Sequence, residues 1–186
     1  FHKRCKNRPP LDFQAVLRQN TPEVIRMKLT DWLNDGKLHL SFEVFPPKTS
    51  TAMENVREAV REIAALHPSF ISVTYGAGGG TSDFTLSLAE EIMKNHHVPS
   101  LAHLTCVSSS RETVHARIAE LKKAEIENVM ALRGDIPPQL TDADRSGWDY
   151  HYAIELIREL KESGADFCIG GACYPEKHPE SPDSVE

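Results

Sequence analysis

No apolar run in this 186-residue chain approaches the roughly 20 residues that a membrane-spanning helix needs. The first residues, FHKRCKNRPP, carry positive charge but no apolar stretch follows them, so we do not expect a secretory signal. The four cysteines, at positions 5, 106, 168 and 173, form no Cys-x-x-Cys pair, and two of them lie in apolar strand-like runs. We therefore expect reduced thiols and a cytoplasmic protein.

Basic residues are also in the minority. Lysine and arginine number 21 against 27 aspartates and glutamates, for a net charge of −6. A nucleic-acid-binding surface is expected to be basic, so this balance argues against one. The hydrophobic content of 40% is ordinary for a globular domain, and the chain is long enough to bury a sizeable core.

Four strand-like stretches carry polar residues on one alternating face: LHLSFEVF, FISVTY, LAHLTC and VMALRGD. Strand side chains alternate with period two, and by this count Val73, Leu104 and Leu132 lie on one face. The polar residues predicted for the opposite face are Ser41, Glu43, Ser72, Thr74, His103, Thr105, Arg133 and Asp135. Strands of a parallel α/β sheet are normally apolar on both faces, so a polar face indicates a site and favours an enzyme.

Helical patterns separate these strands, and a fifth strand, DFCIGGACY, follows the last helix. Glu43 and Thr74 are 31 positions apart, a spacing typical of βαβ units. Such units form either a doubly wound sheet or a (β/α)8 barrel, and the polar face favours the barrel. A full barrel needs about 250 residues. We therefore expect an α/β fold of the (β/α)8 TIM-barrel type, truncated to about the first five βα units.

The N-terminal region differs from the rest in composition. Residues 1–26 are predicted to be a basic, proline-containing tail, and residues 27–186 a partial barrel domain. Thr21 is a good start for a helix that ends at Gly36. In the alternative interpretation the domain begins at Met27, and Thr30 caps a shorter helix.

Glu43 is the strongest candidate for a catalytic residue. A carboxyl group inside an apolar strand is expected to be partly desolvated, so it keeps its proton more readily and suits a proton donor. The alternative is an ion pair between Glu43 and a neighbouring basic side chain.

A glycine-rich segment, Tyr75 to Gly80, follows the second strand. Its glycines permit a close approach of the backbone to a phosphate or a planar ring. The segment does not match the Gly-x-Gly-x-x-Gly pattern of dinucleotide-binding folds, and a flexible loop is the alternative interpretation.

The fourth strand ends with a cation and an anion two positions apart, Arg133 and Asp135. They are suited to an anionic ligand and a hydrogen-bonding heterocycle, and an internal salt bridge is the alternative. His103 has the pattern of a core histidine with satisfied hydrogen bonds. The spacing of Cys173 and His178, like that of His103 and Cys106, matches no usual zinc pattern, so no metal site is predicted.

Taken together, these segments resemble the methylenetetrahydrofolate reductase family. The matching motifs are SFEVFPPKTS (41–50), FISVTYGAGG (70–79), AHLTC (102–106), ALRGD (131–135), the Tyr152-Ala153 pair that opens a helix, and ACYPEKHPE (172–180). They occur in the order typical of the family. The resemblance implies a flavin-binding (β/α)8 barrel that reduces 5,10-methylenetetrahydrofolate to 5-methyltetrahydrofolate, with hydride from NADH or NADPH through FAD.

The resemblance also implies roles for individual residues. Glu43 matches the general acid, which protonates the bridging nitrogen of the folate, and Asp135 matches an aspartate beside the flavin and the pterin. The residues that match FAD-contacting positions are Thr74, Tyr75, Ala77, His103, Arg133, Gly134, Asp135, Tyr152, Ala153, Ala172, Tyr174 and His178. Thr74 also matches a position near the nicotinamide.

The chain departs from the family in length, because the later strands that supply further FAD contacts and a folate-binding glutamine are not in this sequence. A competing hypothesis is therefore a non-catalytic, truncated barrel fragment that does not hold FAD alone. An open sheet of five strands exposes an edge, which a partner chain or a homo-oligomer would cover. A different flavin barrel, such as proline dehydrogenase, lacks support, because the Glu43 and ALRGD motifs are not its signature.

Overall fold

The computed structural model describes residues 27–47, 49–75, 82–136 and 147–178. Its elements follow one another in the order α2 (Leu29–Leu33), β1 (Ser41–Val44), the 3₁₀ helix η1 (Ser50–Ala52), α3 (Met53–Ala64), β2 (Phe70–Val73), α4 (Ser82–His96), β3 (Ser100–Thr105), α5 (Arg111–Lys123), β4 (Asn128–Leu132), α7 (Ala153–Glu162) and β5 (Cys168–Gly171). Strands and helices alternate, which confirms the predicted α/β class. No helix within these ranges is long and apolar enough to cross a membrane.

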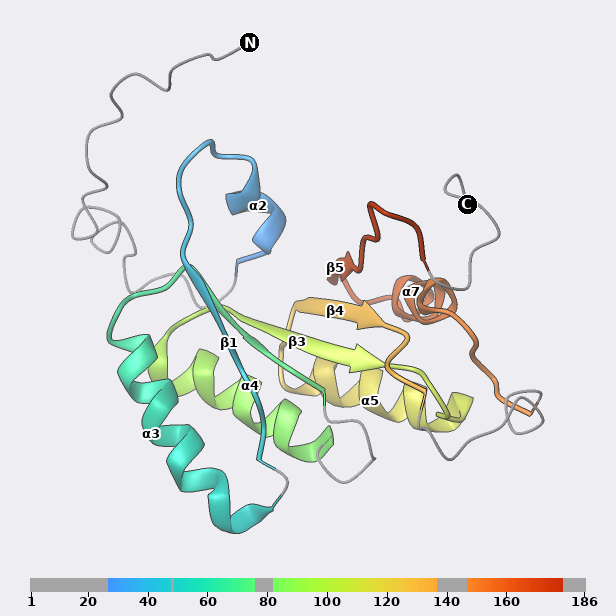
Figure 1. Cartoon of the computed structure of the whole chain (residues 1–186), viewed down its shortest axis with the longest axis horizontal. Coiled ribbons are helices and arrows are strands. Elements are labelled where there is room, and N and C mark those ends of the chain that lie inside the picture. Colours follow the sequence, from blue (N-terminus) through green and yellow to red (C-terminus); the bar gives the residue numbers. More distant parts are fainter. Residues whose placement is uncertain (1–26, 48, 76–81, 137–146, 179–186) are drawn as a thin grey trace.

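All five strands are parallel and form one sheet in the order β1-β2-β3-β4-β5. Each strand therefore pairs with the next one along the chain. Successive strands are always added on the same side of the sheet. In a doubly wound fold, by contrast, the strand order reverses at one point. The carboxyl ends of the strands consequently meet at one edge, and the arrows of β3 and β4 point toward it in Figure 1.

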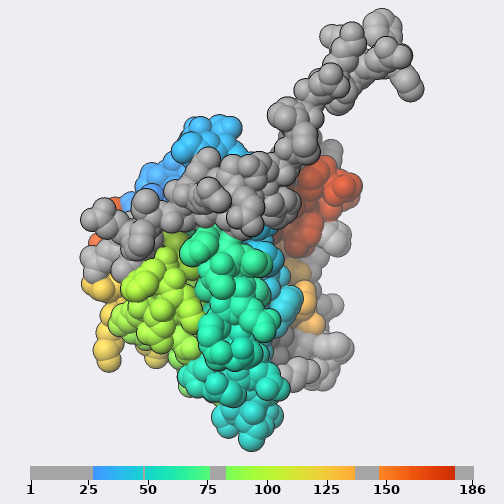
Figure 2. All heavy atoms as spheres, turned by 90° about the vertical axis from the view of Figure 1, so that its left-hand side faces the viewer, coloured from blue at the N-terminus to red at the C-terminus, as the bar shows by residue number. Residues whose placement is uncertain are grey.

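The helices that connect the strands cover one face of the sheet, and α3, α4 and α5 lie together below the strands in Figure 1. From the helices Val60, Leu88, Ile92, Leu121, Leu156 and Leu160 enter one apolar core, where they meet strand residues Ile71, Val73, Ala102, Val129 and Ala131. Figure 2 shows α3 and α4 side by side, and Arg57 Nε donates to Glu91 Oε2 across them at 2.9 Å. Burial of this apolar face is the main driving force for the fold.

The helices of successive repeats end in the same way. His67, His97, Glu125 and Gly164, which follow α3, α4, α5 and α7, all have positive φ, between 51° and 72°. A left-handed residue at this position ends an α-helix by turning the chain away from the helix axis. Gly164 is the predicted C-terminal glycine of its helix, whereas the other three residues adopt the same conformation with a side chain.

The short helix α2 is anchored to the opposite end of the sheet from the strand carboxyl termini. The side chain of Asn128, at the start of β4, accepts from the backbone N–H of Leu29 at 2.9 Å and donates to the carbonyl of Met27 at 3.0 Å. Lys28 is the N-cap residue of α2, so the prediction that Thr30 caps this helix is wrong. The predicted start at Thr21, the tail at 1–26 and Ala77 lie outside the described residues.

The register confirms the polar face of the first three strands and corrects the fourth. Glu43 pairs with Ser72, and the same face continues along β3 through His103 and Thr105. Thr105 pairs with Leu132, so Leu132 lies on the polar face. The prediction that Arg133 and Asp135 alternate onto this face is wrong, because Leu132 itself occupies the polar face and β4 ends at Leu132. We call the face that carries Glu43, Ser72 and His103 the inner face.

Candidate active site

A cavity of about 520 Å³ lies at the edge where β3, β4 and β5 end. Its lining includes the terminal residues of these strands, Thr105, Leu132 and Gly171. The predicted site residues that line it are Tyr75, Arg133, Gly134, Asp135, Tyr152, Ala153, Ala172, Tyr174 and His178. The tertiary structure thus brings together residues from four separate sequence motifs.

Gly134 shapes the floor of this cavity. Its φ is +87°, and a Cβ atom built on it would lie 2.8 Å from Val107 Cγ1 and 3.1 Å from Thr105 Cβ. The preceding carbonyl, that of Arg133, accepts from the backbone N–H groups of Cys106 and Val107 at 3.2 and 2.8 Å. The loop after β4 therefore packs against the end of β3 at a distance that only glycine permits.

Tyr152 and Ala153 are positioned by the start of α7. The Glu155 carboxylate accepts from the backbone N–H of Tyr152 at 2.8 Å and from that of His151 at 2.6 Å. These bonds satisfy N–H groups that a helix start otherwise leaves without a partner. Tyr152 is 50% exposed and lines the cavity, so a large aromatic residue there is open to a ligand.

Cys106 lies between two cavity-lining residues, Thr105 and Val107, and is completely buried. Its thiol is 4.0 Å from the carbonyl of Arg133 and 3.8 Å from that of Tyr152, so it contacts two segments that line the cavity. Burial, with the nearby Glu155 carboxylate, raises the pKa of this thiol to about 11. Cys106 is therefore a protonated, weakly polar packing group and not a nucleophile.

Tyr174 and His178, which follow β5, also line the cavity. Their rings meet edge to face with centroids 4.8 Å apart, and Tyr174 is 54% exposed. An exposed aromatic pair over a cavity provides apolar contact for a flat ligand.

A second cluster lies on the inner face, around Glu43. The Glu43 side chain is 47% exposed, so the partial desolvation predicted for it is not found in the described residues. Among the described elements, α3, α4 and α5 lie on the opposite face of the sheet (Figure 1), which is consistent with this exposure. The alternative prediction is an ion pair with a neighbouring basic side chain. His103 is such a neighbour, with its Nε2 3.5 Å from Glu43 Oε2, but the two form an ion pair only when the imidazole is protonated.

His103 is more enclosed than its partner, with 13% of its side chain exposed. Burial lowers the pKa of this imidazole below its usual 6.5, and the Glu43 carboxylate partly opposes that effect. His103 is therefore mainly neutral near pH 7, and its contact with Glu43 is not a full ion pair.

The remaining predicted site residues have different outcomes. Thr74 lies just past β2, where its N–H donates to Val44 O and its carbonyl accepts from the Thr85 hydroxyl. Thr74, Glu43 and His103 do not line the cavity at the strand ends, and Ala77 lies outside the described residues. The cavity also contains residues that were not predicted as site residues: Thr105, Val107, Leu132, Ile154, Ile157 and Gly171. Of these, Thr105 could have been found from its place at the end of a polar strand face.

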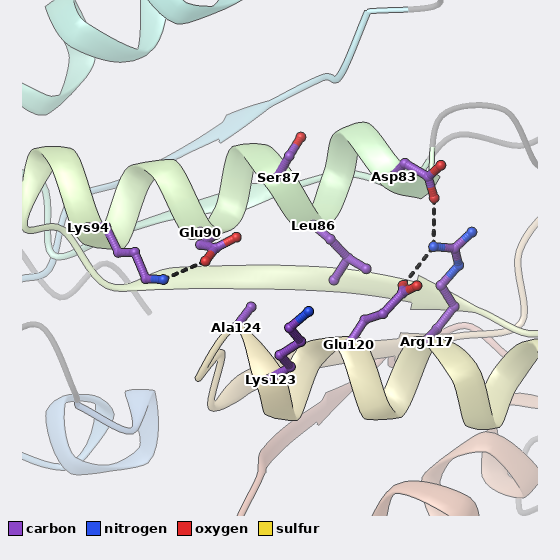
Figure 3. Close-up of a pocket in the computed structure, with 9 residues that line it drawn as sticks. All are labelled: Asp83, Leu86, Ser87, Glu90, Lys94, Arg117, Glu120, Lys123 and Ala124. Carbon is purple, nitrogen blue, oxygen red and sulfur yellow. Dashed lines mark hydrogen bonds and ion pairs between the residues drawn. The ribbon is translucent and has the colours of Figure 1, made fainter.

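A different hollow lies between helices α4 and α5, on the outer surface (Figure 3). Arg117 from α5 reaches Asp83 at 2.6 Å and Glu120 at 2.7 Å, and Lys94 reaches Glu90 within α4. These charges are paired with one another, and the lining comes from α4, α5 and the residue that follows α5, so the hollow is a groove between packed helices. Nowhere among the described residues do three or more His, Cys, Asp or Glu side chains form a group suited to a metal.

Comparison with known proteins relates this architecture to one family. The sequence model of the family described as methylenetetrahydrofolate reductase matches residues 28–186. The 5,10-methylenetetrahydrofolate reductase of Salmonella typhimurium is 38% identical over 167 residues, which are 90% of this chain and 53% of that protein. The enzyme of the same name from Pectobacterium carotovorum is 36% identical over equal shares of both chains.

A plant relative extends the comparison beyond bacteria. The protein named methylenetetrahydrofolate reductase (NADH) 1 of Zea mays is 36% identical over 155 residues, which are 83% of this chain and 26% of that protein. The chain thus spans about half the length of these bacterial relatives and about a quarter of the plant one.

Proposed function

The chain belongs to the methylenetetrahydrofolate reductase family, and on that premise we propose that it forms the front part of a (β/α)8 barrel that reduces 5,10-methylenetetrahydrofolate to 5-methyltetrahydrofolate. The proposed reductant is NADH or NADPH, and the proposed cofactor is FAD. The names of the relatives support the folate substrate, and the plant name supports NADH for that protein. The single observation that carries the proposal is the gathering of the predicted cofactor residues around one cavity.

The strand order supports the barrel. In β1-β2-β3-β4-β5 each strand lies beside the next, as in a sheet that continues around a closed barrel. Active sites of such barrels lie at the carboxyl ends of the strands, and the cavity is at that end.

The residues around the cavity fit a flavin dinucleotide. Tyr152 and Tyr174 offer exposed rings, Arg133 offers a cation for phosphate, and the small residues Ala153 and Ala172 leave room for a planar ring system. When bound, FAD would supply the hydride chemistry. The part of the protein is to bind and orient the cofactor, and Asp135 places an exposed carboxylate at the same cavity.

Glu43 is proposed as the proton donor to the folate. It lies on the inner face, away from the helices, and 47% of its side chain is open to a substrate. A donor must reach the atom that it protonates, so this exposure suits the role better than burial behind the helices would.

A second candidate function is the non-catalytic fragment. In the part of the chain that the structure describes, β1 and β5 each pair with one neighbour only, so the sheet has two edges. If five strands do not complete the cofactor site, this polypeptide alone would not retain FAD.

The visible absorption spectrum tests the proposal. The purified 186-residue chain is incubated with excess FAD and desalted, and a retained, shifted flavin band supports the cofactor site. A folded but colourless protein supports the fragment. Tyr152→Ala, at the cavity, should reduce FAD retention, whereas Leu66→Ala, an exposed residue after α3, should not.

The role of Glu43 is tested on a catalytically active form of the protein. Glu43→Gln should abolish folate reduction and leave reduction of the flavin by the nicotinamide intact, because only the folate needs a proton from this residue. Loss of both half-reactions would contradict the assignment of Glu43 as the proton donor.

A further inference from the structure

We propose that Ser72 and His103 are positioning residues that hold one oxygen of the Glu43 carboxylate against the inner face of the sheet, so that the other oxygen faces the substrate. The inference rests on the proposed function, in which Glu43 is the proton donor. Ser72 has no role assigned by the sequence motifs beyond its place on the polar face.

The contact with Ser72 is set by strand pairing. Glu43 of β1 and Ser72 of β2 are direct register partners, so their side chains project side by side from the same face. Ser72 Oγ lies 3.3 Å from Glu43 Oε2 and 3.4 Å from the carbonyl of Phe42. Ser72 is only 7% exposed, so its hydroxyl has little access to water and is directed to these two acceptors.

The contact with His103 comes from the next strand. His103 Nε2 lies 3.5 Å from Glu43 Oε2, the same oxygen that Ser72 approaches. On the other side of His103 its register partner on β4 is Met130, which carries no charge. Within the described ranges of the chain, Glu43 is therefore the charge that faces this imidazole on the inner face.

Both contacts converge on Oε2. Among the described residues, neither of these contacts involves the other carboxylate oxygen, Oε1. Nearly half of the Glu43 side chain is exposed. A carboxyl group held by one oxygen presents the other in a fixed direction, and a fixed direction is what proton transfer to a bound substrate requires. The geometry thus divides the two oxygens into a held one and a reacting one.

The pKa of His103 can be used to test whether the Glu43 carboxylate is held in place. Burial lowers the pKa of the imidazole and the Glu43 carboxylate raises it, so the pKa of His103 reports how close that carboxylate is held. The experiment is an NMR titration of the imidazole signals of the 186-residue chain, with the His103 signal assigned from its loss in His103→Gln.

Three variants test the arrangement. Glu43→Gln should lower the pKa of His103, because the opposing anion is removed. Ser72→Ala should lower it by a smaller amount, because the carboxylate is no longer held beside the ring. Ser72→Thr, which keeps the hydroxyl, should restore the wild-type value, and Ser72→Ala should cause no further change when Glu43→Gln is already present.

The matched control is Ser100→Ala. Ser100 is a buried serine on β3 that pairs with Ile71 and lies on the helix-covered face, away from Glu43. Ser100→Ala should leave the pKa of His103 unchanged. A change in this control would mean that the loss of any buried hydroxyl loosens the sheet and alters the pKa of His103. If Ser72→Ala does not fold, Ser72→Cys replaces it, because the thiol is a weak donor of similar shape.

Each outcome is informative. An unchanged pKa of His103 in Glu43→Gln would show that the two side chains do not interact, and an unchanged value in Ser72→Ala would remove Ser72 from the arrangement. The titration requires neither FAD nor folate. A chain that fails to retain flavin but shows the predicted pattern would therefore contradict the proposed function and leave the positioning intact.

Discussion

The side chain of Asn128 accepts a hydrogen bond from the backbone N–H of Leu29 at 2.9 Å, across 99 positions of sequence. Asn128 also donates to the carbonyls of Met27 at 3.0 Å and Ser100 at 3.4 Å. One buried amide thus connects the start of α2 with β3 and β4, at the end of the sheet opposite the cavity.

Replacement of this amide should be costly. Asn128→Ala would leave a buried N–H and two carbonyls without their partner, and we expect the free energy of unfolding to fall by about 2–4 kcal/mol. Urea denaturation followed by circular dichroism measures the change. A loss below about 1 kcal/mol would mean that water replaces the amide at this site.

A nearby serine provides the contrasting prediction. The hydroxyl of Ser100 is buried without a hydrogen-bond partner among the described residues. Removal of a buried, unsatisfied polar group relieves its desolvation cost, so Ser100→Ala should be neutral or stabilising, by up to about 1 kcal/mol. The same denaturation experiment tests it, and clear destabilisation would indicate a bound water at this hydroxyl.

Glu159 should give stability that depends on pH. Its carboxylate accepts from His115 at 2.8 Å, Arg111 at 2.5 Å and the Tyr150 hydroxyl at 3.1 Å. The hydrogen bond from His115 is the main cause that lowers the pKa of Glu159 below its usual 4.5. A carboxyl group whose pKa is lower in the folded state contributes stability above the unfolded pKa and loses it as pH falls through the folded pKa.

Glu159→Gln should therefore lower the free energy of unfolding near pH 7 by about 1–2 kcal/mol, and the difference from wild type should shrink as pH falls below 4.5. Urea denaturation at a series of pH values measures the difference. Glu162→Gln makes the same chemical change at an exposed position of α7 and should have little effect at any pH. A difference for Glu159→Gln that stayed constant with pH would contradict the electrostatic explanation.

Glu155 should control the backbone at the cavity rim. Glu155→Ala removes the acceptor for the N–H groups of His151 and Tyr152, so we expect faster hydrogen exchange at both and a loss of about 1–2 kcal/mol. Glu155→Gln keeps an acceptor oxygen and should have a smaller effect. If both variants show wild-type exchange rates at these two amides, the Glu155 carboxylate does not protect them.

Gly134 should not tolerate a side chain. Its φ of +87° and the 2.8 Å approach to Val107 make Gly134→Ala both strained and crowded. Gly36 is the matched control, because it has a φ of +71° with nothing within 4 Å. Gly36→Ala should cost about 1–2 kcal/mol from backbone strain alone. We expect Gly134→Ala to lower the melting temperature further, and equal effects of the two would show that the loop after β4 moves aside easily.

Much of the fold could be predicted from local patterns. The alternation at Glu43 and Ser72 and the glycine at 164 identified strands and a helix end, and both agree with the structure. The face of Arg133 could not be predicted in this way. The period-two count placed Leu132 on the apolar face, whereas its pairing with Thr105 places it on the polar face, and this pairing with a neighbouring strand cannot be read from ALRGD alone.

The candidate site divides in the same way. Motifs identified Tyr152, Arg133 and Tyr174, and the structure places them around one cavity. The sequence did not indicate the groups that hold them, such as Glu155 and Cys106, because their partners are backbone N–H and carbonyl groups that have no sequence signature.

The sequence by itself determined the order of strands and helices and the family, because side-chain periodicity and short motifs depend on neighbouring residues. Only the tertiary structure decided which distant groups meet. Asn128 reaches Leu29, and His103 reaches Glu43, through strand register and helix packing. These depend on burying one apolar face across the whole sheet, and no single segment of the chain contains that information.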